Sequence, residues 1–261
     1  MTAVPSSNLY DHPEYYEIAF SFRDIGREVD VFEECFRRHS KVRVRRVLDI
    51  GCGPCPHMEE LLRRGYEFVG LDLSKAMLDY SRRKAEACKG RAAFLKADMR
   101  KFSLRKPVDF AFTMLGSLSA RTTEDVLSHL SSVAKALNPG GLYFLDWCIN
   151  FQWGDKNGGD DRWTMKRGGV KVNVQFLSED VIDRAAQVRK YTIKAGVDDH
   201  GKRLRLETVE INRVIFPQEF LLLVEKCGKF EFIGWWNNWN LDEPVKKAKR
   251  INRPITLLRR L

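Results

Sequence analysis

The stretch that decides the fold is Val47-Leu48-Asp49-Ile50-Gly51-Cys52-Gly53-Pro54-Cys55. Its first part, Val47–Ile50, is a short, mostly apolar run that is typical of a buried strand. Gly51 and Gly53 end this run, and glycines allow the backbone to approach a bound nucleoside closely. A helix that starts just after the loop would offer its free N–H groups to the same ligand. The stretch therefore predicts a strand, a binding loop and a helix.

The two cysteines of this stretch allow two other interpretations. Cys52-Gly-Pro-Cys55 is the tetrapeptide of thioredoxin active sites, where a helix N-terminus lowers the pKa of a thiol. A zinc site is the other alternative, but no second cysteine pair with ligand spacing follows. Asp72 stands about 20 residues past Gly51, where a ribose-binding acid belongs. A thioredoxin needs no such acid, so we favour a nucleoside site without a metal, and treat both cysteines as small loop residues.

Predicted strands and helices alternate along the first 150 residues. The strands are expected at 47–50, 67–71, 92–95, 108–114 and 142–147, and the helices at 57–64, 74–88 and 122–137, with a turn at 138–141. Such alternation predicts βαβ units and a parallel sheet that is covered on both faces. We therefore expect a Rossmann-like, doubly wound α/β fold with its ligand at the carboxyl edge of the strands.

The chain divides into four expected segments. Residues 1–40 form an aromatic, partly helical cap, and residues 41–149 form the ligand-binding core. Residues 150–216 contain alternating segments and glycine-rich turns such as Gly158-Gly159, which predict an inserted antiparallel sheet of three or four strands. We expect this insertion to be a lid over the acceptor or a dimer interface rather than part of the cofactor pocket. Residues 217–261 supply a helix, 217–227, and two strands, 230–236 and 255–258, that complete a seven-stranded core sheet.

Composition narrows the class of protein. The chain has 261 residues, of which 44% are hydrophobic and 31% charged, so it is globular rather than disordered. No apolar run is long enough to cross a bilayer, and the first residues do not resemble a secretory signal. Six cysteines are too few for a disulfide scaffold, which favours a cytoplasmic location. The net charge of +10 is compatible with nucleic acid, an anionic surface or an acidic small substrate, and is not specific.

Residues 47–147 resemble class I S-adenosylmethionine-dependent methyltransferases, in the group of small-molecule and uncharacterised methyltransferase domains. The matching stretches, in order, are VLDIGCGPC, FVGLDLSKAMLDYSRRKA, FLKADMRKF, VDFAFTMLGSLSA and LNPGGLYFLDW. The segment from Tyr15 to Arg23 also resembles the aromatic lead-in of many members. One departure is Cys55, which stands where the family usually has a third glycine.

The resemblance implies S-adenosylmethionine as the cofactor and assigns residues to its parts. Gly51 and Gly53 would pass under the methionine part, and Arg23 is the candidate for its carboxylate. The adenosine and sulfonium parts would be held by Asp72 at the ribose, Leu73, Asp98 and Met99 at the adenine, Met114 near the sulfonium, and Met77 nearby. Each residue also has a structural alternative: a turn or helix cap for the two acids, plain core for the methionines, and a surface position for Arg23.

Methyl transfer is an in-line displacement, in which the protein mainly orients the acceptor. An amine acceptor must arrive neutral, whereas an oxygen acceptor usually needs a base. Candidates for that base are Tyr16, His12, Asp146 and Tyr10, none of which belongs to a motif, and the remaining histidines His39, His129 and His200 are expected at the surface or in loops.

The acceptor is not fixed by a motif. The β-rich insertion is similar to those of methyltransferases that act on sugar amines and amino acids, which favours methylation of N or O in a small molecule. The alternatives are an RNA methyltransferase that uses the basic surface and a non-catalytic, cofactor-binding partner subunit. The chain has no separate RNA-binding module and no Asn/Asp-Pro-Pro-aromatic tetrad after the fourth strand.

Overall fold

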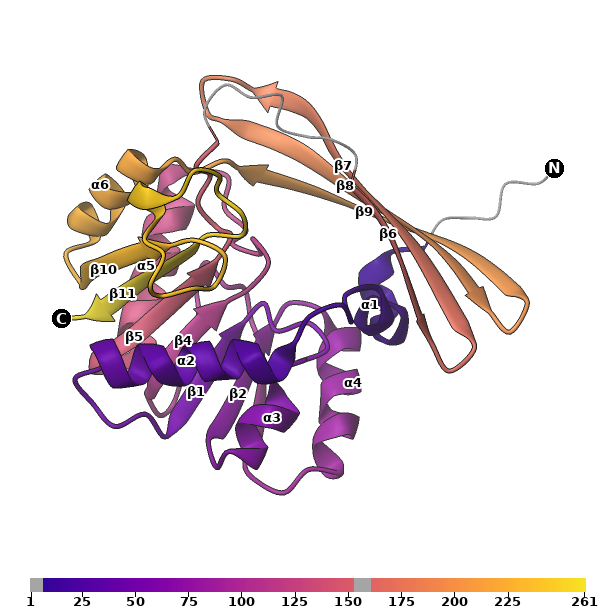
Figure 1. Ribbon diagram of the computed structural model, residues 1–261, viewed down its shortest axis with the longest axis horizontal. Coiled ribbons are helices and arrows are strands. Elements are labelled where there is room, and N and C mark those ends of the chain that lie inside the picture. Colours follow the sequence, from indigo (N-terminus) through magenta and orange to yellow (C-terminus); the bar gives the residue numbers. More distant parts are fainter. Residues whose placement is uncertain (1–6, 153–160) are drawn as a thin grey trace.

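The computed structural model describes residues 7–152 and 161–261 and contains two sheets (Figure 1). The core sheet has seven strands, in the spatial order β10 (Phe230–Trp236), β11 (Ile255–Arg260), β5 (Leu137–Asp146), β4 (Val108–Thr113), β1 (Arg46–Ile50), β2 (Glu67–Asp72) and β3 (Ala92–Lys96). Strands β1 to β5 pair in parallel, whereas β11 runs antiparallel to β5 and to β10. This arrangement confirms the predicted doubly wound fold with seven strands.

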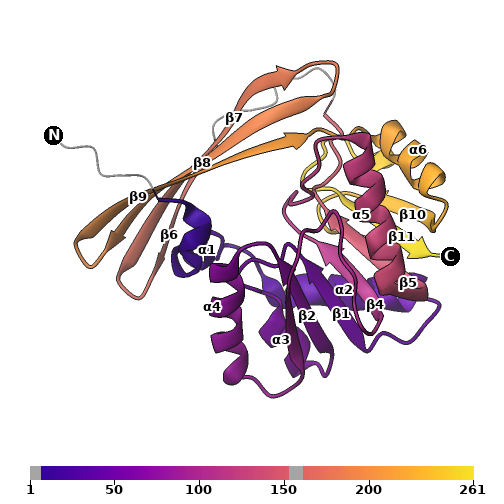
Figure 2. The same cartoon turned by 180° about the vertical axis from the view of Figure 1, so that it is seen from behind.

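Helices cover both faces of the core sheet, as Figures 1 and 2 show from opposite sides. Residues that alternate along the strands divide between two apolar cores. Val47 and Phe110 pack with α2 (Ile25–His39), α3 (Met58–Arg63) and the buried side of α4 (Lys75–Glu86). Leu48 and Tyr143 pack with α5 (Thr123–Ala136) and α6 (Pro217–Cys227). The carboxyl edge of the parallel strands therefore lies between two packed layers of helices.

Local signals fix the helix ends. Ser74 accepts a hydrogen bond from the backbone N–H of Met77 at the start of α4. Thr122 and Asp125 form a reciprocal capping box at the start of α5. Gly228 ends α6 in the left-handed conformation, with φ of 61°. These helix starts and ends agree with the expected ones.

The expectation of a turn at 138–141 was wrong. The structure begins β5 at Leu137, which pairs with Val108, and the pairing resumes with Leu142 opposite Phe110. The extra residues are therefore accommodated as a bulge inside the strand. Gly141 is needed there because a Cβ atom would lie 2.6 Å from the backbone oxygen of Asp109.

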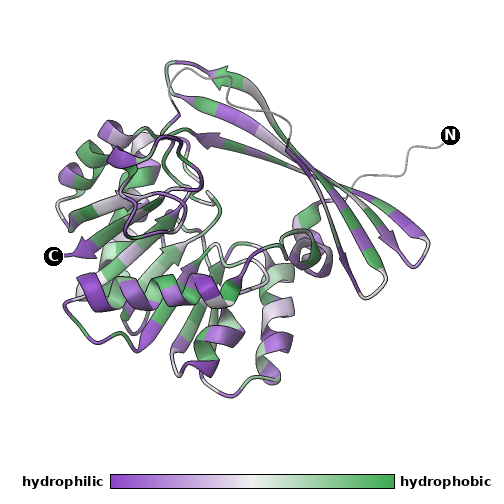
Figure 3. Cartoon of the chain, in the orientation of Figure 1, coloured by the Kyte–Doolittle hydropathy of each residue, from purple (hydrophilic) through white to green (hydrophobic). Residues whose placement is uncertain are grey.

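The second sheet is antiparallel and has the order β6 (Asp161–Arg167), β7 (Val170–Asp183), β8 (Val188–Asp199), β9 (Lys202–Arg213). Polar and apolar residues alternate along its strands (Figure 3). Its apolar face packs on the short helices η1 (Leu9–Asp11) and α1 (Pro13–Ala19). A further 3-10 turn, η2 (Val245–Lys247), lies in the connection from β10 to β11. Residues 153–160, which include the predicted Gly158-Gly159 turn, and residues 1–6 lie outside the described residues.

His129 was expected at the surface or in a loop, and this was wrong. It is fully buried in α5, on the same helix face as Val126 and Val133. Its ring nitrogens contact the backbone oxygen of Met99 at 2.8 Å and the hydroxyl of Tyr143 at 2.7 Å. A polar side chain can be buried in the core when its hydrogen bonds are made there. Sequence periodicity alone does not tell such a buried histidine from an exposed one.

Candidate active site

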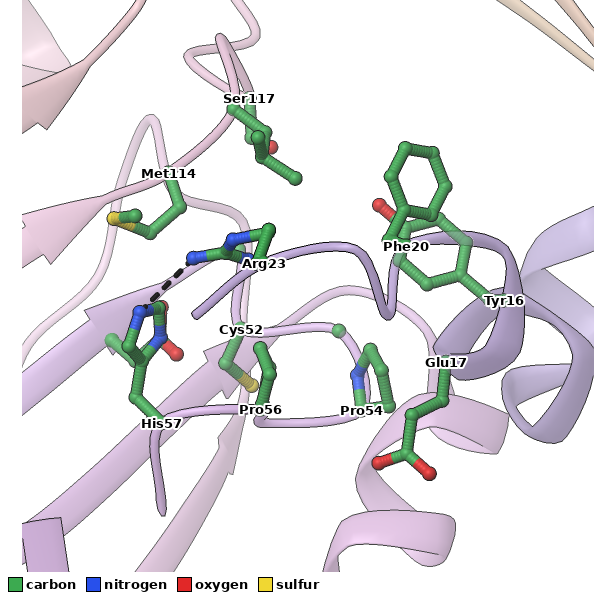
Figure 4. A pocket seen from close by; sticks show the side chains of 14 residues that line it. Tyr16, Glu17, Phe20, Arg23, Cys52, Pro54, Pro56, His57, Met114 and Ser117 are labelled. Carbon is green, nitrogen blue, oxygen red and sulfur yellow. Dashed lines mark hydrogen bonds between the residues drawn. The ribbon is translucent and has the colours of Figure 1, made fainter. Parts of the chain in front are cut away.

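A pocket opens where β1 and β4 end, opposite the helix α1 (Figure 4). Tyr16 and Phe20 form one wall, and Arg23 reaches between the loop after β1 and the loop after β4. The complete set of lining residues is Tyr16, Glu17, Phe20, Arg23, Asp49, Gly51, Cys52, Gly53, Pro54, Pro56, His57, Met114, Leu115 and Ser117. The pocket therefore lies at the carboxyl edge of the parallel strands, where α/β folds bind their ligands.

The glycine loop forms the floor of the pocket and is tied to the end of β2. Gly51 has φ of 71°, and a Cβ atom there would lie 3.0 Å from Cε of Met99. The carboxylate of Asp72 accepts hydrogen bonds from the N–H of Gly53 and the N–H of Ser74, both at 2.8 Å. Burial raises the pKa of Asp72 in spite of these backbone hydrogen bonds. Asp72 thus holds the loop while both of its oxygens keep further acceptor capacity.

Asp49 supplies a buried carboxylate to the pocket. Its side chain is 2% exposed, and its Oδ1 has no hydrogen-bond partner within the described residues. Burial raises its pKa well above the usual range. A buried, unpartnered acceptor calls for a cationic or hydrogen-bond-donating ligand group. The residues of this pocket therefore fit the ammonium group of an amino-acid moiety.

Arg23 belongs to a buried charged cluster. Its guanidinium binds both carboxylate oxygens of Glu28, and its Nη2 lies 3.0 Å from Nε2 of His57. The other terminal nitrogen, Nη1, makes no hydrogen bond within the described residues. Burial alone would raise the pKa of Glu28, but hydrogen bonds from His57 and Arg23 outweigh it and hold this pKa far below its usual range. Arg23 is therefore held in place by one carboxylate and retains donors for a second.

His57 and His129 make stability depend on pH. Burial lowers the pKa of each to about 4, whereas an unfolded chain protonates histidine near pH 6.5. We expect the free energy of unfolding to fall as the pH is lowered from about 6.5 to about 4, by about 3 kcal/mol for each histidine. Urea unfolding at a series of pH values measures this fall. In His129→Asn, the free energy of unfolding should depend less steeply on pH than in the wild type, whereas the exposed control His200→Asn should keep the wild-type dependence. Equal pH dependence of the free energy of unfolding in the two variants would contradict the prediction.

Asp146 lies beside the pocket, but both oxygens of its carboxylate already accept hydrogen bonds. Its carboxylate accepts hydrogen bonds from the N–H of Leu115 at 3.0 Å, from Nε1 of Trp239 at 2.9 Å, and from the guanidinium of Arg253. The side chain is completely buried. Its charge is therefore already neutralised, and its geometry suits holding the Leu115 loop rather than accepting a proton from an acceptor molecule.

The structure brings some predicted residues together and leaves others apart. The pocket is lined by Tyr16, Arg23, Gly51, Gly53 and Met114, with Asp72 and Met99 in contact with its glycine loop. The other predicted residues do not line it. Tyr10 is bonded to Glu210, His12 contacts Ser7 and Glu14, and Asp146 is bound by Arg253. Leu73 is 65% exposed, Met77 is buried, and the carboxylate of Asp98 is bound by Arg100. The roles assigned to all of these residues stay predictions.

Sequence reasoning missed Glu28, His57 and Arg253. Glu28 carried a detectable signal, because it lies one helical turn before Phe32 on the apolar stripe of α2, where a charge is unusual. Arg253 gave no signal, since it lies in an irregular segment and meets Glu28 only through the fold.

The insertion reaches the edge of the pocket without lining it. Glu210 of β9 accepts a hydrogen bond from the hydroxyl of Tyr10 at 2.6 Å, and its charge helps to raise the pKa of Asp72. Asn212 of the same strand accepts a hydrogen bond from Ser119 at 3.1 Å. The second sheet therefore contacts the loop that follows β4 through Ser119, and the charge of Glu210 acts on Asp72 at the end of β2.

Cys52 and Cys55 lie in an environment unlike that of a reactive dithiol. Both are buried, and both sulfur atoms crowd the backbone of Gly70, where a Cβ atom would lie 3.0 Å and 3.1 Å away. Burial raises the pKa of Cys52 well above its usual value, whereas a reactive thiol needs a lowered one. Within the described ranges, no group of three or more histidine, cysteine or acidic side chains could hold a metal ion.

A Cys52→Ser/Cys55→Ser variant should therefore keep its affinity for S-adenosylhomocysteine within about threefold, less than about 0.7 kcal/mol. The wild-type protein should not reduce insulin disulfides. Calorimetry and a turbidity assay measure the two properties. Insulin reduction by the wild type that is lost in the variant would instead establish the thioredoxin-like interpretation.

Comparison with known proteins agrees with this geometry. Residues 47–141 match a family model described as a methyltransferase domain. A dTDP-3-amino-3,4,6-trideoxy-alpha-D-glucopyranose N,N-dimethyltransferase of Streptomyces venezuelae is 28% identical over 142 residues, which are 52% of this chain and 56% of that protein. A ubiquinone biosynthesis O-methyltransferase of Nitrosococcus oceani is 34% identical over 118 residues, 42% of this chain and 47% of the relative. The chain thus spans about half the length of the curated relatives that it matches.

The whole fold also has solved counterparts. The crystal structure of an S-adenosylmethionine-dependent methyltransferase from Clostridium acetobutylicum superposes with a TM-score of 0.74 at 18% identity, covering 94% of this chain and 96% of the other. Residues 47–141 thus match a methyltransferase domain, the chain shares the fold of a solved S-adenosylmethionine-dependent methyltransferase, and the predicted resemblance is confirmed. No helix among the described residues is long and apolar enough to span a membrane.

Proposed function

We propose that the protein is an S-adenosylmethionine-dependent methyltransferase that acts on a nitrogen or oxygen of a small molecule. The observation that carries this proposal is that one pocket presents two complementary groups. These are a buried carboxylate oxygen of Asp49 that has no partner among the described residues, and the guanidinium of Arg23. These groups match the ammonium and carboxylate of a methionine moiety. Asp72, at the end of β2, would hold the ribose of the cofactor.

The bound cofactor would supply the activated methyl group. The residues of this chain would hold the cofactor and orient the acceptor, so that proximity accounts for much of the rate. Tyr16 and Phe20 stand on the wall opposite Met114 and Ser117, where their rings would shield the reacting groups of a bound cofactor from water. The hydroxyl of Tyr16 stays protonated at neutral pH, because burial raises its pKa. It can therefore orient an acceptor by a hydrogen bond but is a poor base.

Nitrogen is the favoured acceptor atom. Burial lowers the pKa of His57 to about 4, which leaves it a weak base, and Asp146 is bound by Arg253. A hydroxyl acceptor usually needs a base, whereas an amine can react once it is neutral. The Streptomyces relative, by its name, dimethylates the nitrogen of an amino sugar, which supports a similar class of acceptor for this chain.

The second sheet is proposed as a lid over the acceptor. Its apolar face packs on α1, which carries Tyr16 into the pocket, with Phe20 at the C-cap of the same helix. The opposite face holds more bases than acids, alternating with the buried residues: Arg162, Lys166, Lys171, Lys194, Arg203 and Arg205 against Asp198 and Glu207. Pairing of this face with itself in a homodimer would bring like charges together, so we favour the lid over the dimer interface.

Incubation of the purified protein with methyl-labelled S-adenosylmethionine and fractions of a metabolite extract tests the proposal. We expect label in a small basic product and release of S-adenosylhomocysteine. Label in RNA would favour an RNA methyltransferase instead. Cofactor binding without any transfer would favour a non-catalytic partner subunit.

A further inference from the structure

Arg253 connects two walls of the pocket without lining it. It stands just before β11, in the segment that returns from β10 to the core sheet. Its Nε and Nη2 donate to the carboxylate of Asp146, at 3.0 Å and 2.8 Å, and its Nη1 donates to Oε1 of Glu28 at 2.8 Å. One guanidinium therefore joins the end of β5 to the helix α2.

Each of these carboxylates in turn holds a residue that lines the pocket. Asp146 accepts a hydrogen bond from the backbone N–H of Leu115. The φ of Leu115 is 52°, in the left-handed region that residues other than glycine rarely adopt. Glu28 binds the guanidinium of Arg23 through both oxygens. Arg253 thus reaches Leu115 through the carboxylate of Asp146 and Arg23 through the carboxylate of Glu28.

Burial makes this arrangement dependent on Arg253. Asp146 is fully buried and the side chain of Glu28 is 6% exposed, so both charges need cationic partners. Asp146 has no other cation among its hydrogen-bond partners in the described chain. Arg253 also packs on the ring of Trp239, with its guanidinium 4.7 Å from the ring centre. The indole N–H of Trp239 donates to the carboxylate of Asp146 as well.

We propose that Arg253 is a positioning residue for methyl transfer. By neutralising Asp146 and Glu28 together, it sets where Leu115 stands relative to Arg23, and hence the distance between the wall near the sulfonium and the group that would hold the cofactor carboxylate. The part of this inference that concerns the cofactor rests on the proposed function. The part that concerns Leu115 and Arg23 does not.

Hydrogen exchange on the protein without added cofactor tests the second part. In Arg253→Met, we expect at least tenfold faster exchange at the amide of Leu115 and faster exchange in peptides covering residues 20–28. The matched control is Arg259→Met, which removes another arginine of the same C-terminal segment, paired with Glu231 on β10. Exchange in a folded Arg253→Met protein equal to that of the wild type would overturn the proposal.

Calorimetry with S-adenosylhomocysteine tests the first part. Arg253→Met should bind at least tenfold more weakly than the wild type, Arg259→Met within twofold, and Arg253→Lys in between, because an ammonium cannot bridge both carboxylates in the same way. If Arg253→Met does not fold, Arg253→Lys decides, and wild-type exchange and affinity in that variant would overturn the proposal.

A double-mutant cycle separates positioning from general destabilisation. In a Glu28→Gln background, Arg253→Met should cost less cofactor affinity than in the wild type, because one of its two partners no longer carries a charge. Equal costs in the two backgrounds would overturn the proposed route through Glu28. A wild-type protein that binds no S-adenosylhomocysteine would overturn the proposed function instead, and the exchange experiment would still decide the role of Arg253.

Discussion

Asp72→Ala should reduce the affinity for S-adenosylhomocysteine at least a hundredfold while the protein stays folded. Two ribose hydrogen bonds to a charged acceptor would be lost, each worth about 1.5–3 kcal/mol. The structure adds a second reason, because the same carboxylate accepts the N–H of Gly53 and so holds the glycine loop at the end of β2. Isothermal calorimetry measures the affinity, and thermal unfolding shows whether the fold survives.

The matched control is Asp79→Ala, which removes an acid from the outer side of α4, where it pairs with Lys75 and Arg82. This control should bind S-adenosylhomocysteine within twofold of the wild type. Unchanged affinity in a folded Asp72→Ala protein would remove Asp72 from the cofactor site and weaken the proposed function with it.

Arg23→Met should weaken binding of S-adenosylhomocysteine at least thirtyfold, or about 2 kcal/mol, and leave binding of adenosine nearly unchanged. Adenosine lacks the carboxylate that the free donors of Arg23 would bind. Glu28 would keep His57 and Arg253 as partners, so the buried carboxylate is not left without a cation. Competition calorimetry with the two ligands separates loss of the carboxylate contact from general damage to the pocket.

Arg27→Met is the control for this variant, since Arg27 is exposed in the first turn of α2, just after the segment that holds Arg23. It should bind both ligands as the wild type does. Equal weakening of adenosine and S-adenosylhomocysteine by Arg23→Met would show that Arg23 shapes the pocket as a whole rather than holding the carboxylate. Asp72→Ala should weaken both ligands, so the two variants form complementary tests.

The order of strands and helices could be predicted from the sequence because it follows from local signals. The apolar run at Val47, the cap at Ser74 and the glycine at Gly228 act over a few residues, where chain geometry dominates. The alternating segments after residue 160 predicted an antiparallel sheet for the same reason. The bulge at 138–141 was not predicted, because its conformation is set by pairing with β4 rather than by the residues Asn138-Pro139-Gly140-Gly141 themselves.

The sequence by itself determined the class of fold and the glycine loop of this protein, because the residues concerned are close together in the chain. Only the tertiary structure decided which charges meet. Glu28 contacts His57, 29 residues away, and Arg253, 225 residues away. Burial then sets the chemistry of these groups: it keeps His57 neutral, raises the pKa of Cys52 and leaves an oxygen of Asp49 without a partner. Burial and long-range ion pairs depend on the packing of the whole chain, which no local pattern encodes.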